Sequence, residues 1–331
     1  MAFSDECSDP SAPATRGWPR WLRLAAVMVV LILAVTFFVD THTVWATLLG
    51  AQPVYLAGCL AIYFAGVVLS CVKWQLLLQT QGLRAPLAQL VRWYLLGALA
   101  SSVLPSDVGG DLGRGYIAGR ALGDHAAAWS SVVVERLTGL AALLLLAALA
   151  LALAPTLLGW PMILPLGLLA AGVAGGAVVG VALRPGSSRM PWLPISVGRV
   201  IGRLQEIAAR YRSSGGILAV CLVLSVAFHV LNAVSLWLLA RTVASDVAPG
   251  VMLVWPLVGL VGLLPLTPGG LGVREGAMAV LLGRAGMSAE QAVAAALLSR
   301  ALLLVGALAG LPPLLDALQR GRRRPLRLKQ E

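Results

Sequence analysis

Two Pro- and Gly-rich breaks in apolar sequence decide the fold: residues 104–114 read LPSDVGGDLGR, and residues 264–274 read LPLTPGGLGVR. The breaks align without a gap at an offset of 160 residues, with Leu, Pro, Gly, Gly and Arg matching in place. Apolar bias alone does not account for matches that include two glycines and a charge, so the breaks indicate an internal repeat. A weaker match downstream relates Glu135-Arg136 to Ser299-Arg300 with a four-residue slip.

The composition around these breaks is that of a membrane protein. Apolar residues make up 59% of the chain and charged residues 12%, whereas soluble domains carry about 25% charged residues. A spanning helix needs roughly 20 mostly apolar residues. We expect six full spans, at about 22–39, 54–78, 127–153, 161–183, 217–240 and 290–315. The sequence therefore predicts an all-α polytopic membrane protein.

Two further apolar stretches run into the breaks. Residues 88–104 stop at the first break, and a short helix is expected to resume at about 111–122. Residues 250–266 stop at the second break, and a short helix is expected to resume at about 271–284. Each stretch with its short helix has the pattern of a helical hairpin folded around a Pro-Gly tip.

The basic residues set the topology. Cytoplasmic segments carry an excess of Lys and Arg, and here these residues gather in the N-terminal tail 1–21, the 79–126 region, the loop 184–216 and the C-terminal tail 317–331. With six full spans, this pattern requires both breaks to be tips of re-entrant hairpins that enter from opposite sides. The predicted transmembrane domain, 22–316, is then an inverted-topology repeat with halves at about 22–160 and 161–316.

Other patterns narrow the class further. The first apolar run ends at Val39 without an A-x-A cleavage site, which predicts a retained first helix. The distribution of Lys and Arg predicts a multi-pass inner (plasma) membrane protein with both termini in the cytoplasm. The four cysteines show no C-x-x-C spacing, so neither a metal site nor a disulfide is expected. The +11 charge is distributed as topology requires, which argues against a nucleic-acid partner. Residues 196–212 fit an amphipathic helix on the inner leaflet and an ordinary basic loop equally well.

Charged residues in or beside the apolar regions are the candidate site. A charge at the bilayer centre costs about 2.5–3.5 kcal/mol on insertion scales, so it needs a partner or a polar cavity. The candidates for contact with a lipid head group are Asp111, Arg114, Glu135, Arg136, Arg274, Glu275 and Arg300. Asp107 also belongs to the charged set.

The spacing of these charges predicts how they pair. Asp111 and Arg114 are three residues apart and are expected to pair along one helix face. Neighbours in sequence, as in the Glu135-Arg136 pair, point about 100° apart on a helix, so we expect cross-helix partners. A pseudo-twofold axis would bring Arg114 near Arg274, and two arginines suit a phosphate. The alternative is a salt-bridge network that only braces the hairpins.

The hairpin tips supply backbone as well as charge. Non-helical backbone inside a membrane is tolerated only where it is packed in protein or lines a watery cavity. The tip residues are Pro105, Gly109, Gly110, Pro268, Gly269 and Gly270. Their glycines would let backbone N–H groups approach a ligand, or would only permit a tight turn. His229 and Asn232, three residues apart, fit a helix–helix hydrogen-bond site better than a proton relay.

Several motifs in this order resemble the lysylphosphatidylglycerol-synthase transmembrane, or flippase-like, family. The first half contributes Leu104-Pro105, Gly109-Gly110-Asp111 with Arg114, Val134-Glu135-Arg136 and Gly139-Leu140. The second contributes Pro265, Pro268-Gly269-Gly270-Leu271-Gly272 and Glu275. The resemblance covers nearly the whole chain after residue 20. It implies a helical bundle with re-entrant segments that handles a lipid between leaflets.

The resemblance also limits the expected activity. Bifunctional family members add a cytosolic aminoacyl-transferase domain, whereas this chain stops about 15 residues past its last expected span. We therefore expect no lysyl-lipid synthase activity. No Ser-His-Asp, H-E-x-x-H, Walker or Rossmann pattern is present, so no ATP hydrolysis, cofactor or enzyme activity is expected.

The sequence thus predicts a lipid translocator that moves an anionic or zwitterionic lipid between leaflets without ATP. Phospholipids, polyprenyl phosphates and hopanoid-type lipids are all candidates. An alternative is a membrane subunit that presents lipid to a separate lipid-modifying transferase. A lipid-modifying enzyme acting through Glu135 or Glu275 is a weaker alternative, since no nucleophile–base pair accompanies either residue.

Overall fold

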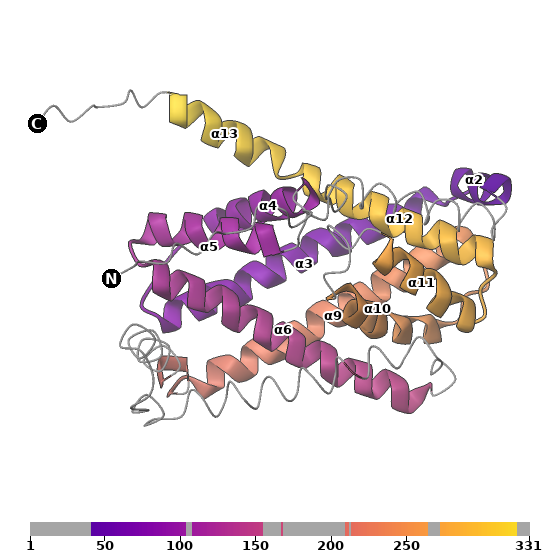
Figure 1. Ribbon diagram of the computed structural model, residues 1–331, viewed down its shortest axis with the longest axis horizontal. Coiled ribbons are helices and arrows are strands. Elements are labelled where there is room, and N and C mark those ends of the chain that lie inside the picture. The colour runs from indigo at the N-terminus through magenta and orange to yellow at the C-terminus, as the bar shows by residue number, and fades with distance from the viewer. Residues whose placement is uncertain are drawn as a thin grey trace, which may run out of the picture. The chain divides into compact units, whose positions relative to one another are not determined.

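The structure is a computed structural model that describes residues 41–103, 108–154, 167, 209–211, 213–263 and 272–322. Helices make up all the regular structure in these ranges (Figure 1). The elements are α2 (Thr41–Leu49), α3 (Pro53–Thr80), α4 (Leu87–Val103), α5 (Val108–Leu122), α6 (His125–Leu153), α9 (Gly215–Val243), η3 (Pro249–Leu253), α10 (Val254–Gly262), α11 (Val273–Arg284), α12 (Ala289–Leu308) and α13 (Leu311–Arg322).

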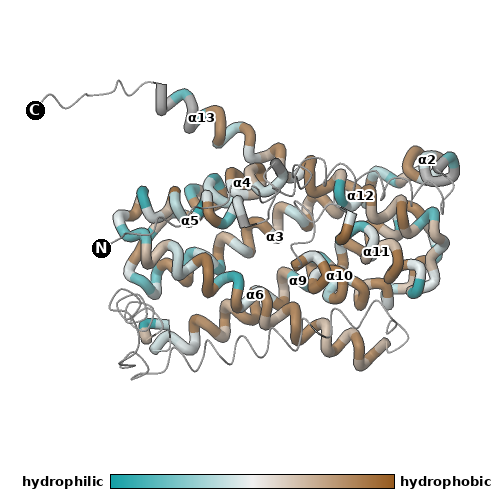
Figure 2. The backbone as a smooth tube through the Cα atoms, in the orientation of Figure 1, coloured by the Kyte–Doolittle hydropathy of each residue, from teal (hydrophilic) through white to brown (hydrophobic). Residues whose placement is uncertain are grey.

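Four helical stretches are long and apolar enough to cross a membrane: Pro53–Thr80, His125–Leu153, Gly215–Val243 and Ala289–Asp316. A helix of 28 residues is about 42 Å long, more than the roughly 30 Å of a hydrocarbon core. Large apolar side chains on these helices face outward, such as Leu153 at 64% and Val223 at 66% exposure, and Figure 2 shows their apolar length. Lipid solvates such side chains, so the chain is a multi-pass membrane protein.

These four stretches confirm four of the expected spans. The bounds of α3, α6 and α9 lie within a few residues of 54–78, 127–153 and 217–240. The expected spans 22–39 and 161–183 and most of the basic loop lie outside the described residues. The count of six full spans stays a prediction.

A pair of short helices flanks each break. The helices α4 and α5 pack against each other, and α10 packs against α11. The tip residues Pro105, Pro268, Gly269 and Gly270 lie outside the described residues. Entry of each pair from one membrane face only, which defines a re-entrant hairpin, stays a prediction.

The bounds of α5 correct one expectation. The helix begins at Val108, so Gly109 and Gly110 lie in its first turn and not in the break. A Cβ at Gly110 would collide with the carbonyl oxygen of Gly97 in α4. Gly110 therefore permits the close approach of two helix backbones, a contact that the sequence pattern alone does not reveal.

Two apolar cores hold the bundle together. One joins α3, α4, α5 and α6 around Trp74 and Leu90. The other joins α9, η3, α10, α11 and α12 around Leu257 and Leu281, and it includes Leu143 of α6. The long helix α9 packs against α3, α6, α10 and α12, so it contacts elements of both cores. Cys59, Cys71 and Cys221 are free and buried, as expected of small apolar fillers.

Candidate functional site

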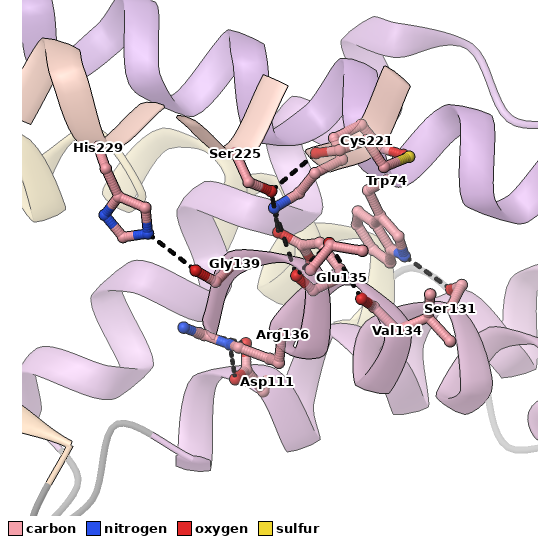
Figure 3. A network of polar contacts seen from close by, with 12 residues as sticks. Trp74, Asp111, Ser131, Val134, Glu135, Arg136, Gly139, Cys221, Ser225 and His229 are labelled. Carbon is pink, nitrogen blue, oxygen red and sulfur yellow. Dashed lines mark hydrogen bonds and ion pairs between the residues drawn. The ribbon is translucent and has the colours of Figure 1, made fainter. Parts of the chain in front are cut away.

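A cluster of charged side chains lies inside the bundle where α3, α5 and α6 meet (Figure 3). Its members are Lys73, Asp111, Arg114, Glu135 and Arg136. Arg114 is 2% exposed and Glu135 is 6% exposed, whereas Arg136 is 60% exposed. The cluster therefore runs from a deeply buried centre to an accessible edge.

Asp111 joins the two arginines of the cluster. Its Oδ1 lies 2.9 Å from Nη2 of Arg114, and it accepts a 2.9 Å hydrogen bond from Nε of the same residue. Its Oδ2 lies 2.5 Å from Nε of Arg136, whose Nη2 donates to Oδ1 at 2.7 Å. The expected pair of Asp111 and Arg114 along α5 is confirmed, and the pair with Arg136 ties α5 to α6.

Arg114 is the centre of the cluster. Its Nη1 lies 2.6 Å from Oε2 of Glu135, and its guanidinium carbon lies 5.0 Å from the Trp74 ring centre and 5.1 Å from that of Tyr94. These aromatic faces favour the cation. Its Nη1 and Nη2 atoms lie at ion-pair distance from Glu135 and Asp111. Two carboxylates and two aromatic faces therefore hold the guanidinium in place.

Lys73 of α3 links the network to α9. Its Nζ donates to Ser225 Oγ of α9 at 3.0 Å and to the backbone oxygen of Glu135 at 3.3 Å. Its distance to the Glu135 carboxylate is 3.8 Å, longer than the contact that Arg114 makes. Of the described residues in the cluster, three are cations and two are carboxylates, so the described cluster carries one excess positive charge.

The second half contains a comparable ion pair. Arg300 Nε of α12 donates to Oε1 of Glu275 in α11 at 2.8 Å. The Oε2 atom of Glu275 accepts from the backbone N–H of Gly272, 2.7 Å away, at the start of α11. This acid thus caps its helix and pairs with the next one. Arg300 follows Glu275 by 25 residues, the same spacing as between Asp111 and Arg136.

Arg274 lies beside a small cavity. Its guanidinium carbon is 5.1 Å from the ring centre of Trp255. The cavity is about 40 Å³ in volume, which is room for roughly three waters. Its polar lining consists of Tyr63, Asn232, Ser235, Arg274, Ser299 and the Trp255 side chain. The indole Nε1 of Trp255 is buried and finds no hydrogen-bond partner in the described part of the chain.

A polar face of α9 runs between the cluster and the cavity. Ser225, His229, Asn232 and Ser235 follow at spacings of four, three and three residues, so they share one face of the helix. Ser225 bonds to Lys73, and Ser235 lines the cavity. Ten residues separate these two serines, which is about 15 Å along the helix axis.

His229 forms the helix–helix hydrogen bond that its sequence position predicts. Its Nε2 lies 3.0 Å from the backbone oxygen of Gly139 in α6. Asn232 instead donates to the backbone oxygen of Phe228 within its own helix. Only the histidine therefore confirms the expected link between helices.

The expected convergence of Arg114 and Arg274 is not found in the described part of the chain. Arg114 contacts groups of α3, α4, α5 and α6, whereas Arg274 lies against α10. Figure 1 shows α5 and α11 well apart. The helix α5 packs on α6, and α11 packs on α12. Asp111 therefore pairs with Arg136, and Glu275 pairs with Arg300, each within its own half of the chain.

The sequence interpretation missed four contributors to the site. They are Lys73, Trp74, Tyr94 and Ser225, which lie outside the set of charged residues that the sequence pattern selects. A lysine eight residues inside a 28-residue apolar helix was the available signal, because a buried ammonium needs partners. Nothing in the sequence points to the aromatic pair around Arg114.

The fold and the cluster define a multi-pass α-helical membrane protein with an ion-pair network inside its bundle. A family model described as the lysylphosphatidylglycerol synthase TM region matches residues 21–310. The chain belongs to this family, as the motifs in its two breaks predict. A search of curated proteins finds no match to the chain.

Proposed function

We propose that the protein moves a lipid with an anionic or zwitterionic head group between the leaflets of the inner membrane, without ATP hydrolysis. The buried charged cluster inside an apolar bundle carries this proposal. Membership of a family described by a lipid synthase's transmembrane region supports a lipid as substrate. Phospholipids, polyprenyl phosphates and hopanoid-type lipids all fall within the proposal, and no catalytic step does.

The cluster offers a head group what bulk lipid does not. A charge crossing the hydrocarbon core costs several kcal/mol, and buried groups of opposite charge lower that cost. Arg114 is the central cation of the cluster, and its planar fork suits phosphate oxygens. The excess positive charge among the described residues favours an anion.

The proposed architecture is an inverted-topology repeat of six full spans and two re-entrant hairpins, with both termini cytoplasmic. The equal 25-residue spacing of the two ion pairs supports the repeat. In each pair, an acid on the second arm of a hairpin meets an arginine on the next helix. Two such units, exchanging access to opposite faces, suit alternating access around a fixed polar path.

Reconstitution tests the proposal directly. Purified protein is placed in vesicles that contain fluorescent phospholipids or polyprenyl phosphates, and the accessible label is bleached from outside. We expect at least one anionic or zwitterionic lipid to cross faster than in protein-free vesicles. If none does, with or without a proton gradient, the translocator proposal is wrong. Copurification of a transferase with such an inactive protein would favour the lipid-presenting subunit.

A further inference from the structure

His229 is a titratable side chain at the middle of a membrane-spanning helix. It lies 14 residues from each end of α9 (Gly215–Val243), about 21 Å from either one. The residue is 9% exposed. A polar side chain at that depth is costly, and its hydrogen bond to α6 uses only Nε2 of the two ring nitrogens.

The contact with Gly139 fixes which nitrogen is available. A backbone carbonyl only accepts hydrogen bonds, so Nε2 of His229 carries the hydrogen of the 3.0 Å bond. In the neutral ring, Nδ1 is then an acceptor. Nδ1 is buried and has no hydrogen-bond partner among the residues that the structure describes. It can therefore take up a proton while the bond to α6 stays intact.

Polar side chains precede and follow His229 on the same face of α9. One turn earlier, Ser225 bonds to Lys73, whose Nζ lies near the same α6 turn that holds Gly139. One and two turns later, Asn232 and Ser235 line the cavity of about 40 Å³. That cavity has room for roughly three waters, so it can hold a water that exchanges a proton with the imidazole.

We propose that His229 binds a proton and thereby couples lipid movement to a proton gradient, with the proton and a monoanionic lipid travelling in the same direction. This inference rests on the proposed lipid translocation. A water on one side of His229 gives a proton to Nδ1, and the neutral imidazole becomes an imidazolium. The same Nδ1 proton later passes to water on the other side, and the neutral ring is restored. The hydrogen on Nε2 stays with Gly139 throughout.

Charge explains why the proton and the lipid head group bind together. Three helices packed against α9 carry charged groups: α3 has Lys73, α6 has Glu135 and Arg136, and α12 has Glu290 and Arg300. The helix α9 itself carries Arg241, whereas η3 and α10, which also pack against it, carry no charged residue. Lys73 opposes a second cation on His229, and Glu135 is already engaged by Arg114. A phosphodiester head group in the path supplies the missing negative charge, so the anion and the proton stabilise each other.

The test uses the full chain in vesicles that contain labelled phosphatidylglycerol, with the membrane potential clamped by potassium and valinomycin. One proton per lipid predicts that a one-unit pH gradient shifts the leaflet ratio of the label about tenfold toward the alkaline side. Reversing the gradient reverses the shift. A pH-sensitive dye inside the vesicles should record proton entry that depends on the lipid.

Two glutamine variants make the test specific. His229→Gln keeps an N–H donor for Gly139 but cannot titrate. We expect the leaflet ratio of the label in this variant to be the same with and without the pH gradient. His125→Gln, the same substitution at the start of α6, should respond like the wild type. A gradient response retained by His229→Gln overturns the assignment of His229.

The wild type alone keeps the inference testable if His229→Gln does not fold. Lipid that crosses with a leaflet ratio indifferent to the gradient, and without lipid-dependent proton entry, overturns proton coupling and leaves the proposed translocation standing. Absence of any lipid movement contradicts the proposed function itself, and the coupling falls with it.

Discussion

Replacing Arg114 with methionine removes the central cation of the charged cluster. Glu135 then loses a partner at 2.6 Å and, of the cations that the structure describes, keeps Lys73, 3.8 Å from its carboxylate. Breaking a buried pair costs about 3–5 kcal/mol, because the remaining charge is left without compensation. We therefore expect Arg114→Met to lower the free energy of unfolding by about 3–5 kcal/mol.

The double variant Arg114→Met/Glu135→Met removes the pair as a whole. Apolar groups of similar volume in place of a buried ion pair are often neutral or stabilising. Asp111 keeps Arg136 as its partner. Lys73 loses the Glu135 carboxylate 3.8 Å away but keeps the Ser225 hydroxyl and the backbone oxygen of residue 135 as acceptors. We therefore expect the double variant to recover part of the loss and to be more stable than Arg114→Met.

Unfolding by SDS in mixed micelles, followed by tryptophan fluorescence, measures both free energies. Equal losses in the single and double variants would refute the reasoning, since they would show that the stranded Glu135 charge is not the source of the cost. A loss below about 1 kcal/mol in the single variant would place the pair in water-like surroundings.

Lipid movement by the stable double variant separates the two interpretations of the cluster. A folded double variant that no longer moves lipid places Arg114 and Glu135 on the head-group path. A double variant that moves lipid at the wild-type rate shows that this pair only braces α5 against α6. The stability measurement comes first, because an inactive and unfolded protein answers neither question.

Three further predictions follow from single contacts. Gly110→Ala should lower the free energy of unfolding by about 1–3 kcal/mol, because its Cβ meets the Gly97 carbonyl; Gly113→Ala in the same helix, with open space around its Cβ, should raise stability by up to about 1 kcal/mol in the same SDS titration. Arg274→Glu places an acid beside the cavity and should slow lipid movement in reconstituted vesicles about tenfold or more, whereas Arg284→Glu, at the exposed end of α11, should leave the rate unchanged. Equal rates for the two variants would show that Arg274 does not lie on the lipid path. In a variant without its native cysteines, Ser245→Cys should react with an impermeant maleimide from outside the cell and Ser213→Cys only after permeabilisation; the opposite result would invert the proposed topology.

The spanning helices were predictable because length and apolar composition are local properties. The expected stretch 127–153 became His125–Leu153, and 54–78 became Pro53–Thr80. Asp124 caps α6 by accepting from the Ala127 N–H, which accounts for the start two residues earlier. The start of α5 was less predictable, because Gly110 is required by its close contact with the backbone of α4 and not by its neighbours in the sequence.

Most charged residues of the candidate site were predictable, whereas of their pairs only Asp111 with Arg114 was. The cost of a charge in lipid identified Asp111, Arg114, Glu135 and the acids and arginines of the second half. Helix geometry ruled out pairing between sequence neighbours and required cross-helix partners, which the structure supplies. Which helix supplies each partner depends on packing, so the contacts of Lys73 could not be read from spacing.

The two ion pairs give a register for the halves that differs from the register of the breaks. Glu275 and Arg300 follow Asp111 and Arg136 by 164 residues, whereas the breaks align at 160. The difference is the four-residue slip between the breaks and the downstream match. In the ion-pair register, Glu135 corresponds to Ser299 and Arg114 to Met278.

The halves therefore share one ion pair and differ in the buried charges around it. Lys73, Arg114 and Glu135 form their network in the first half, and the second half places Trp237, Met278 and Ser299 at the corresponding positions. In an inverted repeat with identical halves, the states open to the two membrane faces would be equal in energy. Charges confined to one half remove that equality, so a head group is held with different strength in the two states. We infer that this difference, and not the shared ion pair, sets how the two states are populated, whereas the gradients of lipid and proton set the direction of net lipid movement.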